Sequence, residues 1–359
     1  MKLIFDCRFI RVDHHDGISR FSAELFSAVS KKVSLVALIS SKDQLKWLPE
    51  GTDFVLGNDP THALAELSLP TKLNKIGATH VFSPMQTMGS WGRRYKLVLT
   101  LHDLIYYSHP KAPSFLPLHI RLAWRLYHLS FFPVRLLLDR ADAVVTVSNT
   151  SKALILSKKL TKRDVHVIYN APETSKENFA AATRPTPEHR RKLVYMGSFM
   201  EYKNVECLIS GMQLLPEFEL VLLSKITQKR KTQLQELAGS WGERIIFRNG
   251  VSDAEYAQEL SSAFAFVSAS KDEGFGIPLV EAMRYGAPIV VSDIPIFREI
   301  AAQAGNFFEH SSPEAFANRI RQLLPLSSWQ DASARSRNRE SDFSWDESAQ
   351  KLLGVLERL

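Results

Sequence analysis

The sequence predicts an α/β protein with two doubly wound domains, and three observations support this fold class. Short apolar runs alternate with helical patterns through both halves of the chain. Strands that are separated by helices form parallel sheets with helices on both faces. The length of 359 residues is large for a single core. Residues 171–190, which are rich in Pro, Thr, Ala and charge, separate the two halves as a linker would.

The apolar runs define the expected strands, and the periodic segments define the expected helices. In the first half, strands are expected at 2–6, 33–39, 80–82, 97–101, 143–147 and 165–168. In the second half, they are expected at 192–196, 219–223, 245–248, 263–267, 288–291 and 306–308. Helical patterns cover 20–30, 205–214, 229–238, 253–262 and 313–324.

The expected domain organisation follows from these elements. It comprises an N-terminal domain at 1–170, a linker at 171–190, a C-terminal domain at 191–342 and a terminal helix at 343–359 that packs back towards the N-terminal domain. Two doubly wound domains that face each other would form a cleft at the carboxyl ends of both sheets. Ligands bind at that edge in folds of this class.

Composition is typical of a globular protein, with 45% hydrophobic and 23% charged residues. The two cysteines, Cys7 and Cys207, lie far apart in apolar contexts. This argues against a disulfide framework or a structural zinc site and fits a reducing compartment. The first ten residues read as a strand, not as a signal peptide, and no apolar run is long enough to cross a membrane. We therefore expect a cytoplasmic protein, with peripheral attachment to the inner face of the cytoplasmic membrane as a further hypothesis.

Positive charge is concentrated in one part of the chain. The net charge is +7, but residues 90–165 alone contain thirteen Lys or Arg and four Asp. Such a stretch attracts nucleic acid, acidic lipid head groups or phosphorylated substrates, or it is simply a solvated basic face. Residues 114–138 mix aromatic and leucine side chains with three arginines. That pattern fits a helix lying on a membrane surface, and equally an ordinary helix that faces the core.

The stretch KDEGFGIPLVE at 271–281 is the most informative part of the chain. It follows an apolar run and precedes a helical pattern, so the expected order is strand, glycine loop and helix. Pro278 suits the first turn of that helix, and Gly286 suits the position after its end. The backbone N–H groups of residues 275–277 would then favour an anion.

Two carboxylates accompany this anion site, Glu273 in the loop and Glu281 in the helix. A ligand with both phosphates and hydroxyls, such as a sugar nucleotide, matches that combination. The alternative is a tight turn with two solvated glutamates. That alternative leaves the spacing of the two acids around a capped helix unexplained.

Further motifs occur in a fixed order along most of the chain. They are Asp16-Gly17-Ile18-Ser19-Arg20, Leu101-His102-Asp103-Leu104, ADAVVTVS at 141–148, VIYN at 167–170, Tyr195-Met196-Gly197-Ser198, Glu201-Tyr202-Lys203-Asn204, VSDIP at 291–295 with Arg298-Glu299, and Phe343-Ser344-Trp345. Together with the two glutamates, this set resembles the family-4 glycosyltransferases of the bacterial mannosyltransferase-like branch. The resemblance implies the GT-B fold, in which two Rossmann-like domains face a central cleft, and it implies transfer with retention.

The resemblance also implies roles for individual residues. Glu273, His102 and Lys203 are expected to be catalytic, with Glu273 on the hydroxyls of the transferred sugar and His102 on the wall of the first domain. Glu281 is expected to hold the ribose hydroxyls of the donor. Further donor contacts are expected from Gly17, Ser198, Lys225, Val251, Phe275, Gly276 and Ile277. Asp103 and Ser148 are expected on the acceptor side.

Phosphate chemistry makes Lys203 the central cation in this scheme. When the anomeric C–O bond breaks, negative charge develops on the departing diphosphate, and electrostatic stabilisation of that charge is a large catalytic term. A compact lysine ammonium suits phosphate oxygens. Many family members carry an arginine where this chain has Ser198, so Lys203 and Lys225 are expected to carry more of the neutralisation.

No metal ion or cofactor is expected. The chain contains no Asp-x-Asp motif, and in the nearest cluster, His14-His15-Asp16, adjacent side chains would point apart.

The predicted function is transfer of a hexose, first of all mannose from GDP-mannose, to a polysaccharide or a lipid-linked glycan. The alternatives are a UDP-sugar donor, an epimerase or phosphorylase of the same fold, and a non-catalytic anion or nucleic-acid binder. No pyridoxal-lysine motif supports a phosphorylase, and no recognisable nucleic-acid module supports the last reading, so no nucleic-acid partner is expected.

Overall fold

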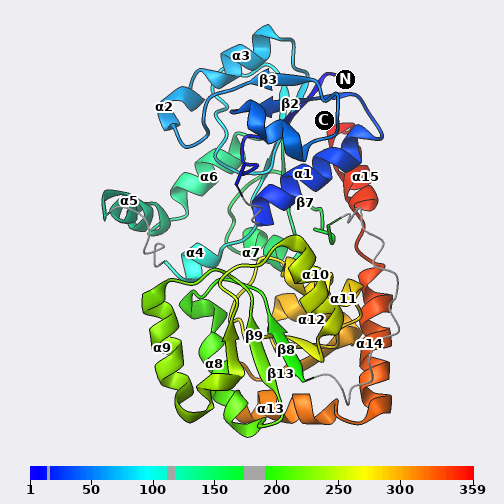
Figure 1. Ribbon diagram of the computed structural model, residues 1–359. Helices are drawn as coiled ribbons and strands as arrows, with labels where there is room; N and C mark the ends of the chain where they lie inside the picture. The colour runs from blue at the N-terminus through cyan, green and yellow to red at the C-terminus, as the bar shows by residue number, and fades with distance from the viewer. Residues whose placement is uncertain (14–16, 111–117, 174–190) are drawn as a thin grey trace. The chain divides into compact units, whose positions relative to one another are not determined.

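The computed structural model describes residues 1–13, 17–110, 118–173 and 191–359. The chain divides into two compact units (Figure 1). Unit 1 combines Met1–Glu173 with Ser344–Leu359, and unit 2 is Thr174–Phe343. The expected boundaries at 170 and 343 therefore lie next to the observed ones. Most of the expected linker is outside the described residues.

Unit 1 contains a seven-stranded sheet in which every pair of neighbours is parallel. Its strands are β1 (Leu3–Asp6), β2 (Leu35–Ile39), β3 (Phe54–Leu56), β4 (His80–Ser83), β5 (Lys96–Thr100), β6 (Ala143–Thr146) and β7 (Val165–Val167). The order is β3-β2-β1-β4-β5-β6-β7. The order therefore reverses between β1 and β4, and the loops after these two strands leave the sheet in opposite directions.

Unit 1 also contains, among its described residues, α-helices and one 3₁₀ helix. They are α1 (Gly17–Ser30), η1 (Lys42–Trp47), α2 (Ala63–Glu66), α3 (Leu69–Lys75), α4 (Ile105–Ser108), α5 (Leu118–His128), α6 (Phe132–Asp139), α7 (Asn149–Ser157) and the terminal α15 (Trp345–Leu356). Helix α15 packs on α1, and the Trp345 indole N–H donates to the carbonyl of Pro172 over 3.0 Å. The terminal helix thus belongs to unit 1, although 170 residues separate it from the rest of that unit in the sequence.

Unit 2 contains a six-stranded sheet, again parallel between all neighbours. Its strands are β8 (Lys192–Tyr195), β9 (Glu219–Leu222), β10 (Ile245–Phe247), β11 (Ala265–Ser268), β12 (Ile289–Ser292) and β13 (Gly305–Phe308). The order β10-β9-β8-β11-β12-β13 reverses between β8 and β11. Its helices are η3 (Glu201–Lys203), α8 (Val205–Gly211), η4 (Met212–Leu214), α9 (Gln228–Ala238), η5 (Gly239–Arg244), α10 (Asp253–Ser262), α11 (Ile277–Arg284), α12 (Pro295–Ala301), η6 (Ala302–Ala304), α13 (Pro313–Gln322) and α14 (Leu326–Glu340).

The expected α/β class and all twelve expected strands are confirmed, with ends shifted by one or two residues. Strand β3 is missing from the sequence prediction. It has only three residues at the edge of its sheet, and Phe54 and Leu56 are exposed, so it lacks the buried apolar run that marks the other strands. Edge strands are often this short.

The predicted ends of α11 are confirmed. Pro278 lies in the first turn, and Gly286 has a φ of 60° directly after the helix. The N–H of Gly286 donates to the carbonyl of Met283, and the N–H of Ala287 donates to that of Ala282. These two bonds form a Schellman motif, which satisfies the last carbonyls of the helix.

Both cysteines are free and buried. Burial raises the pKa of the Cys207 thiol to about 12. No helix among the described residues is long and apolar enough to cross a membrane.

Candidate functional site

Most of the predicted site residues of unit 2 lie along one edge of its sheet. Because all strands of this sheet are parallel, the loops that follow them leave from the same edge. Ser198 and Lys203 follow β8, Lys225 follows β9, Val251 follows β10, and Glu273, Phe275, Gly276 and Ile277 follow β11. Strands β8 and β11 are the neighbours between which the strand order reverses, and ligands of doubly wound folds bind beside such a point.

Lys203 and Glu273 form an ion pair at this point. The Lys203 Nζ lies 2.5 Å from Glu273 Oε1, and both side chains are largely shielded from solvent. Two loops that are 70 residues apart in sequence therefore bring a cation and a carboxylate together. Charge-assisted hydrogen bonds of this kind are among the strongest in proteins.

The loop that carries Lys203 is held by its neighbour Asn204. Asn204 has a φ of 51°, in the left-handed region that asparagine tolerates better than most residues. Its side-chain amide donates to the carbonyl of Ala269 over 3.2 Å and to that of His310 over 2.7 Å. The N–H of Lys271 also donates to the carbonyl of Tyr202. These bonds tie the Lys203 loop to the ends of β11 and β13.

Serines near the end of β11 and β12 hold Glu273 and its loop in place. The Ser270 hydroxyl donates to Glu273 Oε1 over 2.8 Å. The hydroxyl oxygens of Ser268 and Ser270 lie 3.1 Å apart, within hydrogen-bonding distance. The Ser292 hydroxyl donates to the carbonyl of Ser270, which anchors the loop to β12. Sequence reasoning missed these serines. The pattern Ser268-Ala269-Ser270 directly after an apolar strand could have indicated them.

Glu281 lies on α11 and is buried. The Tyr256 hydroxyl of α10 donates to Glu281 Oε2 over 2.8 Å. A buried carboxylate requires such partners because leaving it without hydrogen bonds is costly. Tyr256 was not predicted as a site residue, since a tyrosine on the buried face of a helix reads as an ordinary core residue.

The start of α11 has the geometry that the glycine loop predicts. Gly276 has a φ of 90°, and a Cβ there would lie 3.2 Å from the Phe297 ring, so glycine suits this position. Phe275 is buried and packs edge-on against Phe343 at 5.7 Å. The packed ring fixes the loop while its backbone leads into the helix at Ile277.

Three further residues follow neighbouring strands. Ser198 is exposed, and its carbonyl accepts a bond from the buried Tyr195 hydroxyl over 2.7 Å. The aliphatic part of the Lys225 side chain lies against Gly250. A Cβ added at Gly250 would lie 2.9 Å from Lys225 Cγ. Val251 is half-buried beside that glycine. The structure places all three on the same sheet edge as Glu273, and their contacts with a donor stay predictions.

In unit 1, the predicted residues follow β5 and β6. His102 Nε2 lies 2.8 Å from the carbonyl of Pro84, and its ring packs edge-on against Phe21 of α1 at 5.1 Å. Asp103 accepts a bond from the N–H of Ile105. Ser148 is buried and caps α7 by accepting a bond from the N–H of Ser151 over 3.0 Å. These contacts give Asp103 and Ser148 structural roles, and their acceptor-side roles are untested.

Gly17 is the first residue of α1. The candidate metal cluster His14-His15-Asp16 lies outside the described residues. Within the described ranges, no group of three or more His, Cys, Asp or Glu side chains is arranged to hold a metal ion.

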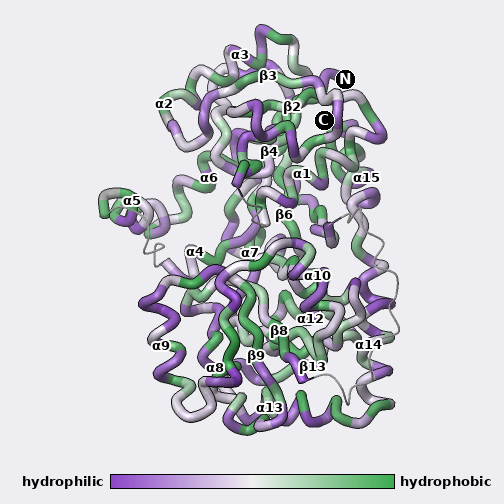
Figure 2. Tube along the Cα trace, in the orientation of Figure 1, coloured by the Kyte–Doolittle hydropathy of each residue, from purple (hydrophilic) through white to green (hydrophobic). Residues whose placement is uncertain are grey.

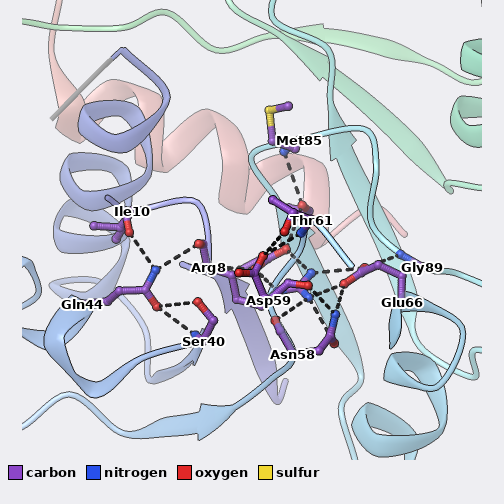
Figure 3. Close-up of polar contacts among 12 residues, drawn as sticks. Arg8, Ile10, Ser40, Gln44, Asn58, Asp59, Thr61, Glu66, Met85 and Gly89 are labelled. Carbon is purple, nitrogen blue, oxygen red and sulfur yellow. Dashed lines mark hydrogen bonds and ion pairs between the residues drawn. The ribbon is translucent and has the colours of Figure 1, made fainter. Parts of the chain in front are cut away.

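A buried charge cluster at the end of β1 was missed by sequence reasoning (Figure 3). The Arg8 guanidinium pairs with Asp6 at 2.8 Å and with Glu66 at 2.5 Å, and all three residues are buried. Burial acts to lower the pKa of Arg8, but Asp6 and Glu66 outweigh it and raise that pKa above its ordinary value. The signal was present as two charged residues on either side of Cys7, directly after the first strand.

This cluster also organises the loops around His102. The Ser83 hydroxyl donates to Asp6 Oδ2 over 3.1 Å, and the Ser83 carbonyl accepts a bond from Thr100. The next residue, Pro84, provides the carbonyl that His102 contacts. On the other side, the N–H of Gly89 donates to Glu66 Oε2 over 2.8 Å. A Cβ at Gly89 would lie 1.9 Å from the Glu66 carbonyl oxygen, so only glycine fits there.

A separate basic hollow of about 450 Å³ lies in unit 1 between β7, α7 and α15. Lys152, His166, Lys351 and Arg358 contribute to its lining. None of the predicted site residues lines it.

The two units correspond to two known sequence families. Residues 63–176 match the family described as Glycosyltransferase Family 4, and residues 176–340 match the family described as Glycosyl transferases group 1. The chain belongs to the family-4-type glycosyltransferases of the GT-B fold. The resemblance that the motifs indicated is thereby confirmed, and the ion pair, the glycine loop and Glu281 all lie within the second match.

Two similar relatives are O-antigen enzymes. The chain is 24% identical over 381 aligned positions to "O-antigen chain mannosyltransferase B" of Escherichia coli, covering 96% of this chain and 97% of that protein. It is 25% identical over 251 positions to "O-antigen chain mannosyltransferase RfbU" of Salmonella typhimurium strain LT2, covering 69% of this chain and 65% of the relative. The match to the serotype-specific mannosyltransferase WbdA of Escherichia coli covers only 13% of that longer protein.

Solved structures share the fold of the whole chain. The sucrose-phosphate synthase of Thermosynechococcus elongatus has a TM-score of 0.73 at 16% identity and covers 99% of this chain and 98% of its own. Anabaena HepE in complex with UDP-glucose has a TM-score of 0.72 at 17% identity, with full coverage of both chains. At such identities the likeness establishes the fold alone.

Proposed function

We propose that this glycosyltransferase transfers a hexose from a nucleotide sugar with retention and without a metal ion. GDP-mannose is the first candidate donor, and a polysaccharide or lipid-linked glycan is the acceptor. The observation that carries the proposal is the Lys203–Glu273 pair beside the point where the strand order reverses. It joins a cation suited to phosphate with a carboxylate suited to sugar hydroxyls. The names of the mannosyltransferase relatives support the choice of mannose.

In the proposed reaction, the anomeric C–O bond of the donor breaks and its electron pair leaves with the diphosphate. Lys203 stabilises the charge that develops on the phosphate oxygens, and the N–H groups at the start of α11 add to this effect. An acceptor hydroxyl attacks the anomeric carbon from the same face, and its proton passes to the departing phosphate. Retention follows from this front-face attack.

The two glutamates share the hydroxyls of the donor in this proposal. Glu273 binds the transferred sugar, because its carboxylate is held in the loop by Lys203 and Ser270. Glu281 binds the ribose, oriented by the Tyr256 hydroxyl. Carboxylates suit both tasks because each oxygen accepts directed hydrogen bonds. No step requires a metal ion if Lys203 and Lys225 neutralise the diphosphate, so activity should persist in EDTA.

A thermal-shift experiment tests which nucleotide sugar is the donor. The panel comprises GDP-mannose, UDP-glucose, UDP-galactose and a UDP-N-acetylhexosamine. A ligand at about 100 times its Kd stabilises the folded state by about 2.7 kcal/mol, which shifts Tm clearly. We expect GDP-mannose to give the largest shift. A shift with UDP sugars alone would support the UDP-sugar alternative, and no shift with any nucleotide sugar together with tight oligonucleotide binding would support a nucleic-acid binder.

Turnover of the best donor tests the assignment of Glu273. We expect Glu273→Ala to lower kcat by about 100-fold or more, the range seen when a group that stabilises the transition state is removed. Glu236→Ala, on the exposed side of α9, is the matched control and should keep full activity. Unchanged turnover in Glu273→Ala would show that the central assignment is wrong.

A further inference from the structure

The basic hollow in unit 1 has no part in the proposed transfer reaction. It lies between β7, α7 and α15, all of which belong to this unit (Figure 1). Its volume of about 450 Å³ is within the range of about 300–1,000 Å³ that is usual for small-molecule sites. Figure 2 colours α15 in both hydrophobic and hydrophilic shades, because one face of the helix is buried and the other is exposed. Residues of α15 form one wall of the hollow.

Positively charged side chains line the hollow from three sides. Lys152 comes from α7, His166 from β7, Lys351 from α15, and Arg358 from the turn after that helix. None of the described lining residues is Asp or Glu. Like charges that are gathered without counter-charges repel one another. The lining therefore favours an anionic ligand.

Two of these cations have no carboxylate partner among the described residues. The side chains of Lys152 and Arg358 form neither an ion pair nor a hydrogen bond within the described ranges. Lys351 lies 4.0 Å from Glu347, but both side chains are more than half exposed, so water solvates this pair. The positive charge of Lys152 and Arg358 is thus available to a ligand from outside the chain.

The imidazole of His166 responds to the same cations. Burial lowers its pKa most, and the charges of Arg358 and Lys152 lower it further, whereas Asp164 acts in the opposite direction. Two cations from different elements therefore lie close enough to act on this ring. An anion bound between them would offset their effect and raise the pKa of His166.

A glycine in α15 keeps the hollow wide. Gly354 lies within the helix, where glycine is less favourable than alanine. A Cβ at this position would meet no described atom within 4 Å, so no close packing requires a glycine. Gly354 lines the hollow, and a side chain there would extend into its space. The helix thus has an unfavourable residue at the position where a side chain would narrow the hollow.

We propose that the basic hollow binds a small molecule with a phosphate monoester group. Lys152 and Arg358 contact the phosphate oxygens, and the space beside Gly354 holds the rest of the ligand. A phosphate monoester carries a charge of about −1.5 to −2 at neutral pH, which matches two cations. Its oxygens also accept the paired hydrogen bonds that a guanidinium donates. A phosphodiester, as in nucleic acid or a lipid head group, carries about one negative charge and matches less well.

Nuclear magnetic resonance of the full chain, isotope-labelled at its histidines, tests the proposal. The His166→Gln variant identifies the signals of His166. Three probes share one skeleton: glycerol, glycerol 3-phosphate and the diester glycerophosphoglycerol. We expect glycerol 3-phosphate to shift the His166 signals until they saturate and to raise the pKa of His166. Glycerol should have no effect, and the diester should bind more weakly than the monoester.

Variants of the lining residues test the roles of charge and space. Lys152→Gln and Arg358→Gln should each weaken the binding of glycerol 3-phosphate about tenfold, because each removes a charge-assisted hydrogen bond. Gly354→Leu should weaken binding about tenfold or more, because its side chain fills the hollow. The same variant should not lower the urea midpoint, since leucine is more favourable than glycine in a helix.

Matched controls change similar residues elsewhere. Lys72→Gln with Lys75→Gln removes two exposed cations from α3 in the same unit, and Gln235→Leu adds an exposed leucine to α9. Lys203→Met removes the central cation of the proposed donor site. All three controls should bind glycerol 3-phosphate at the hollow as the unchanged chain does, because none of these residues lines it.

Four outcomes would overturn the proposal. They are no saturable shift of the His166 signals, an equal response to glycerol and glycerol 3-phosphate, unchanged affinity in the Lys152, Arg358 and Gly354 variants, and tighter binding of the diester, which would assign the hollow to a lipid head group. The experiment contains no nucleotide sugar or acceptor, so its failure would leave the proposed transferase activity standing.

Discussion

At the scale of single residues, the Arg8 cluster shows how much one buried charge can matter. Arg8 forms ion pairs with two buried carboxylates, those of Asp6 and Glu66, inside unit 1. We expect Arg8→Met to lower the free energy of unfolding by about 3–5 kcal/mol, because it leaves two buried carboxylates without their cation. Urea unfolding measures this change.

The matched control is Arg298→Met. Arg298 pairs with Asp293 on the surface, where ion pairs contribute little because water solvates both charges. The control should leave the unfolding midpoint nearly unchanged. Equal midpoints for Arg8→Met and the unchanged chain would contradict the stabilising role of the cluster.

Lys203 is the second residue whose role can be measured directly. Lys203→Met should lower kcat by about 100-fold or more if the ammonium stabilises the departing diphosphate. It should also weaken binding of the free nucleoside diphosphate, measured by calorimetry. A variant that loses only stability and keeps its kcat would limit Lys203 to holding the Glu273 loop.

At the scale of elements, the end of α11 gives a prediction about glycine. Gly286 adopts a φ of 60°, which a residue with a Cβ adopts at a cost. Gly286→Ala should therefore lower the free energy of unfolding by about 1–2 kcal/mol. Gly354→Ala is the control, because Gly354 lies within α15 and its Cβ would meet no atom within 4 Å. That change should raise stability by about 0.5–1 kcal/mol. Urea unfolding should therefore show a lower free energy of unfolding for Gly286→Ala and a higher one for Gly354→Ala.

Helix α5 shows the limit of pattern reading at the scale of elements. Its sequence mixes apolar and basic residues at helical spacing, which fits either a buried or an interfacial helix. The choice depends on which residues find partners in the fold. Tyr106 packs on Trp124 and Tyr107 packs on His128, whereas Leu118, Leu122 and Leu126 are exposed among the described residues. No local pattern specifies that outcome, because the partners come from another helix.

At the scale of the whole molecule, three histidines of unit 1 should make stability depend on pH. Burial lowers the pKa of His80, His128 and His166 below the ordinary value. The histidines of the unfolded chain therefore take up protons near the ordinary histidine pKa of about 6.5, whereas those of the folded chain do so only at lower pH. Stability should fall as the pH drops through that value and should be highest above it.

Urea unfolding between acidic and neutral pH measures this dependence. The variant His128→Phe keeps an aromatic ring against Tyr107 and removes one titrating group. Its stability should vary less steeply with pH than that of the unchanged chain. An identical slope in the variant would show that His128 does not contribute.

Much of this protein could be predicted from its sequence. The alternation of apolar runs and helical patterns determined the α/β class and twelve strands, because burial on both faces requires continuous apolar residues. Pro278 and Gly286 determined the ends of α11 through their backbone preferences. The order of Glu273, the glycine loop and Glu281 predicted an anion site with two acids. All these signals are local, so neighbouring residues are enough to specify them.

Only the tertiary structure decided which distant residues meet. The contact of Lys203 with Glu273 spans 70 positions, that of Tyr256 with Glu281 spans 25, and that of Arg8 with Glu66 spans 58. Each contact exists because of the order in which strands and loops assemble, and a list of strands does not state that order. The sequence therefore determined the long buried strands, several helices and the kind of chemistry. The pairing of strands determined which side chains meet, because that pairing brings the ends of non-consecutive strands together.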